Sequence, residues 1–208
     1  MTQYLQIHPD DPQPRYLERA AMIVREGGIV AFPTDSCYAL GCHLGDKAAV
    51  DRIRAIREVD DRHHLTLMCR DLSEIAHFAR VDNAQYRLLK ATTPGSYTFI
   101  LEGTKELPRR VLHPKRKTIG LRVPEHRVAQ AFLEALGEPL LTTTLILPGD
   151  EAPLTEGWEI QDRLDGQVEL ILDGGHCGTE PTTVIDLTGG LPALVRAGRG
   201  SLTPFALD

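Results

Sequence analysis

The sequence predicts a single α/β domain, residues 1–208, built on a twisted mixed sheet with helical cover. Helical and strand patterns alternate along the chain, which indicates a sheet covered by helices. Several late strands follow one another without an intervening helix, so we expect antiparallel as well as parallel neighbours. Hydrophobic residues make up 42% of the 208 residues. At this length they can build a core that needs neither disulfides nor a structural metal.

The first half of the chain contains four helical patterns and two strand patterns. Apolar residues at helical spacing run through 15–26 and stop at two glycines. Asp46 and Asp82 stand where side-chain N-caps are expected, and Asp71 or Ser73 opens a short helix between them. The expected elements are helices at 15–26, from 46, from 71 or 73 and from 82 to Pro94, with strands at 29–32 and 65–68.

The second half is dominated by strands. Apolar and β-branched runs separated by short glycine-containing turns favour strands there. One helix, 125–136, carries an apolar face and ends at Gly137, a residue that commonly follows the last helical turn. The expected strands are 97–101, 118–123, 140–145, 168–172, 182–187 and 194–195.

The chain has no feature of an exported or membrane protein. Its opening stretch is polar and lacks a cationic apolar leader, and no apolar run approaches membrane-spanning length, so a cytoplasmic protein is expected. The four cysteines are then expected to be free thiols. A zinc site is the alternative, but the tight paired spacings of zinc modules are absent. Its ligands would be Cys37, Cys42, His43 and a residue near His176–Cys177.

Charge is distributed unevenly. The net charge of −6 argues against bulk attraction to nucleic acid, yet residues 105–117 hold six basic side chains against one acid. Pro108 and Pro114 interrupt this loop, so its cations cannot share one helix face. With few aromatics nearby, contact would be with the phosphates of duplex or structured RNA. A solvated loop is the equal alternative. The candidate RNA-binding residues are Lys105, Arg109, Arg110, Lys115, Arg116 and Lys117.

Hydroxyl and cationic residues gather at strand ends, although the usual phosphate-binding loops are missing. Threonines occur at Thr34, at 142–144 and at 182–183. A buried hydroxyl is costly without a partner, so three such clusters favour a polar pocket. Cross-strand packing of β-branched residues is the alternative for any one of them. Arg122 and Arg196 lie inside apolar runs, and such an arginine must be paired or face a cleft. A surface-facing or salt-bridged arginine is the alternative for each.

The segment 60–64, Asp-Asp-Arg-His-His, invites a metal-binding interpretation. Adjacent residues of an extended segment point to opposite sides, so His63 and His64 would rarely bind one ion together. We therefore expect a polar loop with one functional histidine and no dedicated metal site.

Five motifs occur together in a known family. Their order spans nearly the whole chain, and the agreement identifies a resemblance to the YrdC-like superfamily, with 65–74 and 97–106 most similar to its YciO branch. The motifs are Phe-Pro-Thr-Asp-Ser-x-Tyr-Ala-Leu-Gly (32–41), Pro-Gly-x-Tyr-Thr-Phe-Ile-Leu (94–101), Lys-Thr-Ile-Gly-Leu-Arg-Val-Pro (117–124), Thr-Thr-Val-Ile-Asp-Leu (182–187) and Leu-Val-Arg-Ala-Gly (194–198).

The resemblance implies a fold and a ligand. Members enclose a large, open, positively lined cavity, and the best-known ones are threonylcarbamoyl-AMP synthases of tRNA modification. These combine threonine, bicarbonate and ATP, with Mg2+ accompanying the nucleotide. The family positions for the threonine or threonylcarbamoyl part correspond here to Thr34, His64, Arg122, Thr144 and Thr182. The positions for the nucleotide correspond to Arg57, Thr118 and Arg196.

Two synthase signatures are altered in this chain. The synthases carry Lys-x-Arg after the second helix and Ser-x-Asn after the threonine-rich strand, where this chain has Arg57-Glu58-Val59 and Thr144-Leu145-Ile146. Losing one charge-assisted phosphate contact at Val59 should cost about 1.5–3 kcal/mol, and losing the amide at Ile146 about 1 kcal/mol. We therefore expect weaker binding of the triphosphate of ATP.

Three functions remain open from the sequence. The favoured one is binding of an adenine nucleotide (ATP or an AMP-type ligand) or a threonylcarbamoyl-AMP-like acyl-adenylate, with hydrolysis of the latter, in a protein associated with double-stranded or structured RNA such as tRNA or rRNA. The second is a threonylcarbamoyl-AMP synthase. The third is a non-catalytic RNA-binding module. The catalytic residues and the oligomeric state are left open by the sequence.

Overall fold

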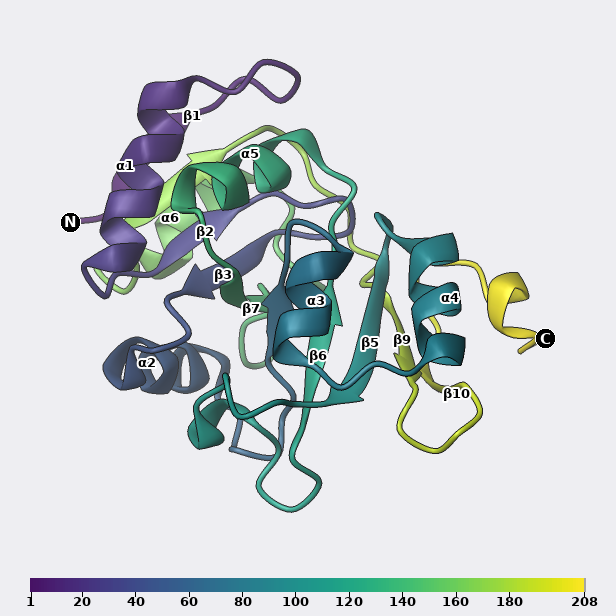
Figure 1. Cartoon of the computed structure of the whole chain (residues 1–208). Coiled ribbons are helices and arrows are strands. Elements are labelled where there is room, and N and C mark those ends of the chain that lie inside the picture. The colour runs from purple at the N-terminus through teal and green to yellow at the C-terminus, as the bar shows by residue number, and fades with distance from the viewer. Residues whose placement is uncertain (208) are drawn as a thin grey trace.

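A computed structural model describes residues 1–207, which form one ten-stranded mixed sheet and six α-helices (Figure 1). The strand order is β1-β8-β2-β3-β7-β4-β6-β5-β9-β10. The strands are β1 (Gln3–Gln6), β2 (Val30–Phe32), β3 (Ala39–Cys42), β4 (Thr66–Met68), β5 (Tyr97–Glu102), β6 (Thr118–Arg122), β7 (Leu140–Thr144), β8 (Leu170–Asp173), β9 (Thr183–Asp186) and β10 (Ala193–Arg196).

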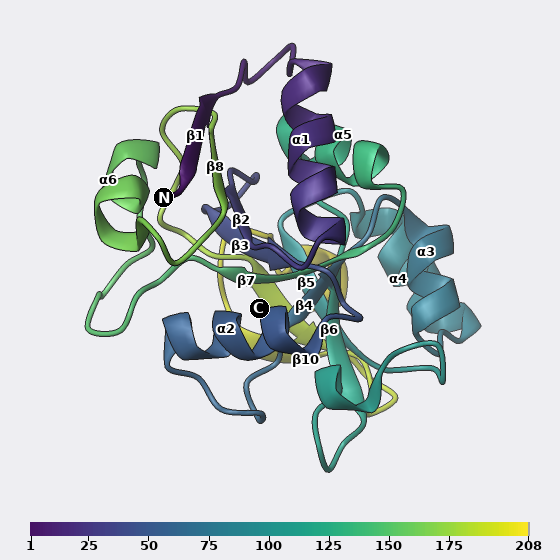
Figure 2. The same cartoon turned by 90° about the vertical axis from the view of Figure 1, so that its left-hand side faces the viewer.

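The helices cover both faces of the sheet. Figure 2 shows α1 and α5 on one side and α2 on the other. The helices are α1 (Pro14–Arg25), α2 (Lys47–Arg57), α3 (Leu72–Phe78), α4 (Asn83–Thr92), α5 (Arg127–Leu136) and α6 (Gly157–Leu164), with 3-10 turns η1 (Arg109–Val111) and η2 (Thr203–Phe205). The α/β class, the mixed sheet and the helical cover predicted from the sequence are therefore confirmed.

Side-chain alternation along the strands explains the two hydrophobic cores. Successive residues of a strand point to opposite faces. On β8, Leu170 and Leu172 pack under α1 and α5, and Ile171 between them joins the larger core on the other face. In the core under α1 and α5, the rings of Phe32 and Phe132 pack edge to face with their centroids 5.2 Å apart. Burial on both faces holds the central strands rigid, and the site is built on these strands.

The acidic N-caps predicted for three helices are present. The side chain of Asp46 accepts a hydrogen bond from the amide of Ala49 at 2.9 Å. Asp71, rather than Ser73, caps α3, and Asp82 forms a reciprocal capping box with Gln85. Each cap satisfies a helix-end amide that would otherwise have no intrahelical partner.

Three elements were not predicted from the sequence. Strand β1 lies at one edge of the sheet and carries polar residues at both ends, so it lacks a strand pattern. Strand β3 is fully buried between β2 and β7, but it contains Gly41 and no β-branched residue. At Gly41 a Cβ would lie 2.6 Å from the Leu140 side chain, so close packing requires glycine there. Helix α6 begins without a side-chain cap, in the acidic segment 150–173.

The four cysteines, at positions 37, 42, 69 and 177, are free and buried. Burial raises the pKa of the Cys42 thiol to about 12, with the Asp46 charge contributing. None of the helices formed by residues 1–207 is long and apolar enough to span a membrane.

Candidate functional site

A pocket of about 330 Å³ lies over the middle of the sheet. Its floor is one row of register partners on four neighbouring strands: Ile100 on β5 faces Gly120 on β6, Gly120 faces Thr66 on β4, and Thr66 faces Thr142 on β7. All four line the pocket. Because Gly120 has no side chain and the two threonines are short, the strand register itself leaves space above the sheet.

The pocket is lined by cations and by hydroxyl groups. Among the described residues that line it there is no Asp or Glu. The basic lining residues are Arg57, Arg62, Arg122, Arg196, His63 and His64, and the hydroxyl-bearing ones are Ser36, Tyr38, Thr66, Thr98, Thr142, Thr143, Thr144 and Thr182. Such a lining favours an anionic ligand that also carries hydrogen-bonding groups.

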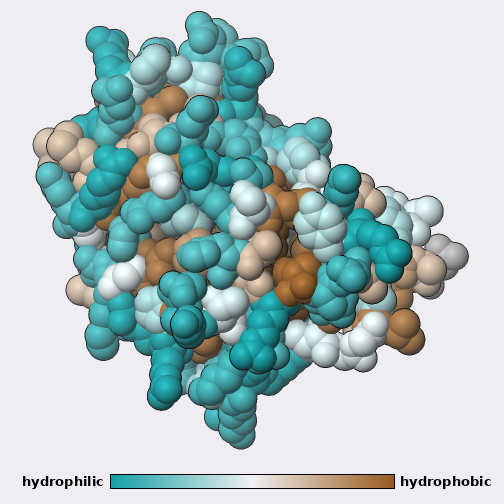
Figure 3. Space-filling view, in the orientation of Figure 1, coloured by the Kyte–Doolittle hydropathy of each residue, from teal (hydrophilic) through white to brown (hydrophobic). Residues whose placement is uncertain are grey.

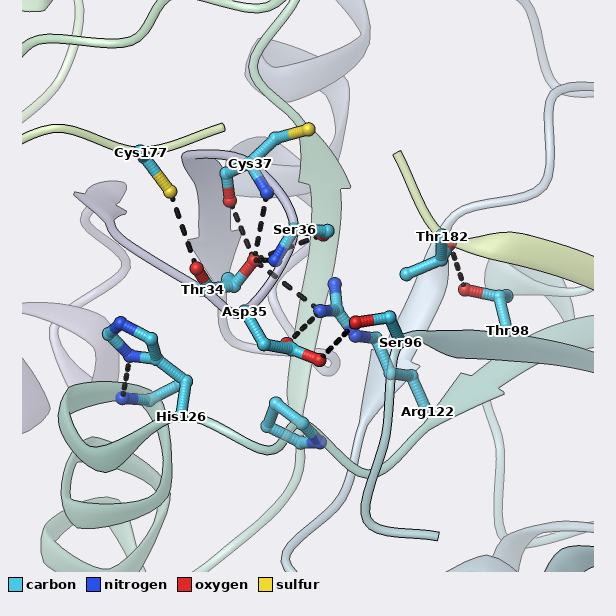
Figure 4. Close-up of polar contacts among 12 residues, drawn as sticks. Thr34, Asp35, Ser36, Cys37, Ser96, Thr98, Arg122, His126, Cys177 and Thr182 are labelled. Carbon is cyan, nitrogen blue, oxygen red and sulfur yellow. Dashed lines mark hydrogen bonds and ion pairs between the residues drawn. The ribbon is translucent and has the colours of Figure 1, made fainter. Parts of the chain in front are cut away.

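The inner end of the pocket is defined here as the lining residue Arg122 together with Thr34, Asp35 and Ser96, which lie behind the lining around it (Figure 4). Arg122 forms an ion pair with Asp35, and the two side chains are only 7% and 9% exposed. Ser96 donates a hydrogen bond to the second carboxylate oxygen of Asp35 at 2.8 Å. The Nε of Arg122 is buried without a partner among the described residues. The charge of this end is balanced, but one strong donor remains unused.

The mouth of the pocket is defined here as Arg57, Val195 and Arg196. Arg57, at the end of α2, donates to the Thr143 hydroxyl at 2.7 Å and to the Thr144 carbonyl. Arg196, on the edge strand β10, donates to the Thr182 carbonyl at 2.9 Å. Neither arginine forms an ion pair among the described residues. Burial lowers the pKa of Arg57, and the charge of Arg196 lowers it further. The mouth therefore carries uncompensated positive charge.

Both histidines of the segment 60–64 line the pocket. Burial is the main cause that lowers the pKa of His64, and the neighbouring His113 and Arg116 lower it further. Partial burial and the charge of Arg57 lower the pKa of His63 as well. With pKa values below their usual 6.5, both rings are neutral at pH 7 and each offers a ring nitrogen that can accept a proton.

Paired hydroxyls form the wall between the two ends. Thr98 and Thr182 share a hydrogen bond of 2.8 Å between their hydroxyl oxygens (Figure 4). Thr142 donates to the Thr66 carbonyl at 2.9 Å. The threonines that the sequence gathered at strand ends thus satisfy one another or the backbone, and so can be buried at low cost.

Six of the eight pocket residues proposed from the sequence line this one pocket, and two lie behind it. The six are Arg57, His64, Arg122, Thr144, Thr182 and Arg196. The hydroxyl of Thr34 donates to the Cys37 carbonyl at 2.6 Å and so holds the turn after β2. The hydroxyl of Thr118 lies 2.9 Å from Nε2 of His64. Thr34 and Thr118 therefore support residues that line the pocket.

Sequence reasoning missed Asp35 and Ser96. Asp35 lies in the conspicuous Phe-Pro-Thr-Asp-Ser motif, but its partner Arg122 is 87 positions away and Ser96 is 61 away. A buried arginine requires a counterion, and that requirement was the only available signal. It could not select one acid among the 29 in the chain.

Metal-ligating side chains do not gather into a site in the part of the chain that the structure describes. No group of three or more His, Cys, Asp or Glu side chains that could hold an ion occurs within residues 1–207. Because the described pocket lining has no carboxylate, Mg2+ accompanying a nucleotide would have phosphate and water as its ligands.

Together the fold and the pocket define an α/β protein with a central, cationic, hydroxyl-lined pocket. Residues 22–198 match the profile of the Sua5/YciO/YrdC family, which carries the description "Telomere recombination". The chain belongs to this family. It is 57% identical to YciO of Escherichia coli over 205 residues, covering 99% of this chain and all of that protein. The crystal structure of E. coli YciO superposes with a TM-score of 0.96 over the same shares.

Relatives with a stated activity are more distant. A threonylcarbamoyl-AMP synthase of Chromobacterium violaceum is 31% identical over 185 residues, covering 88% of this chain and 94% of the synthase. Pyrococcus abyssi Sua5, in a crystal structure complexed with L-threonine, is 28% identical with a TM-score of 0.87. That match covers 95% of this chain but 58% of Sua5. The chain is thus of the YciO branch and related to the synthases.

Proposed function

We propose that the protein binds an adenine nucleotide or a threonylcarbamoyl-AMP-like acyl-adenylate in this pocket, hydrolyses the acyl-adenylate, and holds structured RNA. The ligand proposal depends on one observation at the mouth of the pocket: Arg57 and Arg196 lie close together without an acidic partner among the described residues. A guanidinium cannot lose its charge at neutral pH, so a bound phosphate relieves their repulsion.

The altered signature positions support a monophosphate ligand over a triphosphate. Ile146 lines the pocket where the resemblance places an asparagine, and its side chain offers no hydrogen bond. Val59 is outside the lining, so the position of the synthase arginine contributes no cation to the pocket. Arg57 and Arg196 suffice for one phosphate. We expect AMP-like ligands to bind at least as tightly as ATP.

The pocket residues support hydrolysis of an acyl-adenylate, whose acyl carbon is joined to AMP through a phosphate oxygen. Water adds to the acyl carbon, the bond from that carbon to the bridging oxygen breaks, and AMP leaves with its phosphate charge held by Arg57 and Arg196. The proton lost by the water passes to a neutral histidine, His63 or His64. Because a base must be unprotonated to act, the reaction should be fastest above the pKa values of these rings.

One incubation series separates hydrolysis from synthesis. The protein is supplied first with ATP, threonine and bicarbonate, and separately with threonylcarbamoyl-AMP, while AMP and pyrophosphate are followed. We expect AMP from threonylcarbamoyl-AMP and little pyrophosphate from the synthase mixture. Val59→Arg together with Ile146→Asn should raise synthase activity. Synthesis by the wild-type protein at the rate of a dedicated enzyme would refute the proposal, and so would tight ATP binding with negligible AMP binding in calorimetry.

The basic loop, residues 105–117, supports the RNA proposal. It projects at the bottom of Figure 1, and the surface there is hydrophilic (Figure 3). Lys105, Arg109 and Lys115 have no side-chain hydrogen bond or ion pair among the described residues. Arg116, in contrast, pairs with Asp186, and Arg110 donates to the Gly45 carbonyl. The first three are therefore the cations that reach a phosphate backbone most easily.

Salt dependence tests the RNA proposal. Each phosphate contact adds close to one unit of slope to the fall of log affinity with log salt concentration. Charge reversal to Glu at Lys105, Arg109 and Lys115 should reduce the slope for a duplex RNA by about three units. Reversal of Arg87, Arg15 and Arg19, which lie on α4 and α1, is the control with the same change of net charge. Equal slopes for the loop and control variants would leave the loop without an RNA role.

A further inference from the structure

The basic loop is joined to the pocket through His113. The rings of His113 and His64 stack with centroids 5.2 Å apart and planes inclined by 26°. His64 lines the pocket, so this stack spans from the loop to the ligand site. His64 also contacts Thr118, the first residue after the loop, through Nε2 at its ring edge, which lies 2.9 Å from the hydroxyl. His64 is thus held by two residues at the base of the loop.

His113 also holds the shape of the loop. Its Nδ1 accepts hydrogen bonds from the amides of Lys115 at 3.3 Å and Arg116 at 3.2 Å. Its own amide donates to the Thr118 carbonyl at 2.8 Å, and its carbonyl accepts from the Lys117 amide at 2.9 Å. The side chain of His113 therefore adds two hydrogen bonds to a turn that its main chain also closes, and the same side chain lies against the pocket histidine.

We propose that His113 is a positioning residue for His64, and that RNA bound to the basic loop alters the pocket through this stack. The coupling rests on the proposed function, whereas the positioning role rests only on the geometry. An RNA phosphate at Lys115 or Arg116 competes with Asp186 for the Arg116 guanidinium. Release of Arg116 loosens the turn whose amides hold His113, and the ring moves relative to His64.

The electrostatics around His64 give the coupling a measurable sign. The groups that face it are His113 and Arg116 from the loop, His63 beside it, Asp186 from β9 and the Thr118 hydroxyl from β6. Burial, His113 and Arg116 lower the pKa of His64, while Asp186 raises it. Removal of the covering ring, or neutralisation of Arg116 by RNA phosphate, should therefore move that pKa upward.

Three substitutions separate the two tasks of His113. His113→Phe keeps a ring against His64 but has no Nδ1 acceptor. His113→Asn keeps an acceptor for the loop amides but has no ring, and His113→Ala has neither. The midpoint of the His64 ring titration, followed by NMR, should rise most in the Ala and Asn variants and least in the Phe variant, which keeps the covering ring but lacks the charge of His113. An equal midpoint in all four proteins would show that His113 does not position His64.

Addition of a short duplex RNA at low salt tests the coupling. We expect the His64 ring resonances to shift in the wild type and to stay still in His113→Asn, although both bind the RNA. AMP affinity should change severalfold with RNA in the wild type, and RNA affinity by the same factor with AMP, because coupling is reciprocal. RNA binding with an unresponsive His64 would overturn the coupling alone. Failure of the wild type to bind RNA would overturn both the coupling and the proposed RNA function, and the titration midpoints would still decide the positioning role.

Discussion

The two ends of the pocket place arginine side chains in opposite electrostatic environments. At the inner end Arg122 is paired with Asp35, and Ser96 satisfies the same carboxylate. At the mouth the acceptors of Arg57 and Arg196 within residues 1–207 are all neutral, namely backbone carbonyls and threonine hydroxyls. The first arrangement is complete without a ligand, whereas the second leaves repulsion between two cations that only an added anion removes.

This difference separates stability from binding. A buried ion pair contributes little net stability, but removal of one partner is costly because the other charge remains unpaired. An uncompensated cation near the surface slightly lowers the free energy of unfolding, because like charges repel. It gains an anionic partner when a ligand binds. We therefore expect substitutions at the inner end to affect unfolding and substitutions at the mouth to affect affinity.

The largest effect is expected from Arg122→Ala. This change leaves Asp35 buried without its counterion, so the free energy of unfolding should fall by about 3–5 kcal/mol. Urea denaturation measures it. The control is the double variant Asp35→Asn with Arg122→Met, in which no charge is stranded and most of the loss should be recovered. Equal losses in the single and double variants would mean that the pair is not the cause.

Arg57→Met and Arg196→Met should weaken ligand affinity and leave the stability of the fold almost unchanged, which is the opposite of the effect expected at Arg122. Each removes one charge-assisted phosphate contact, worth about 1.5–3 kcal/mol, and should weaken AMP binding about ten- to hundredfold. The free energy of unfolding should stay the same or rise slightly, because repulsion at the mouth is relieved. For each variant, calorimetric titration measures the affinity for AMP and urea denaturation measures the free energy of unfolding. Lost stability with retained affinity would contradict the assigned roles.

A smaller effect, without any change of charge, is expected at the floor between the two ends. A Cβ on Gly120 would lie 3.0 Å from Cγ2 of Thr98 and 3.2 Å from the Thr66 hydroxyl. Gly120→Ala should therefore displace Thr98, cost about 1 kcal/mol by overpacking and reduce AMP affinity. Gly189→Ala, where the added Cβ meets nothing within 4 Å, is the matched control. Wild-type affinity in Gly120→Ala would place the ligand away from this floor.

The smallest effect concerns pH. Burial is the main cause that lowers the pKa values of His63, His64 and His126 from the usual 6.5. The unfolded chain therefore binds more protons than the folded chain between the lowered values and 6.5. The free energy of unfolding should then fall as pH decreases through this window and level off at higher pH. His64→Gln should flatten part of the slope, and a full slope in that variant would exclude His64 as a contributor.

Local patterns were sufficient for much of the fold. The caps at Asp46, Asp71 and Asp82 and the apolar periodicity of α1 and α5 depend on neighbours within one or two helical turns, so the sequence displays them directly. Strand β3 could not be found in this way, because Gly41 is there to accommodate Leu140, a residue 99 positions further along the chain. Such tertiary packing has no local signature.

For the site, the sequence by itself determined the residue types: arginines inside apolar runs and threonines at strand ends, which need buried polar partners. Only the tertiary structure decided which of them share a pocket. Strand register aligned Ile100, Gly120, Thr66 and Thr142 into one floor, and chain crossings brought Asp35 to Arg122 and His113 to His64. The physical reason is that the charge and the hydrogen-bonding groups of a side chain depend on its residue type alone. The partners that satisfy them depend on which strands pair across long distances in the sequence.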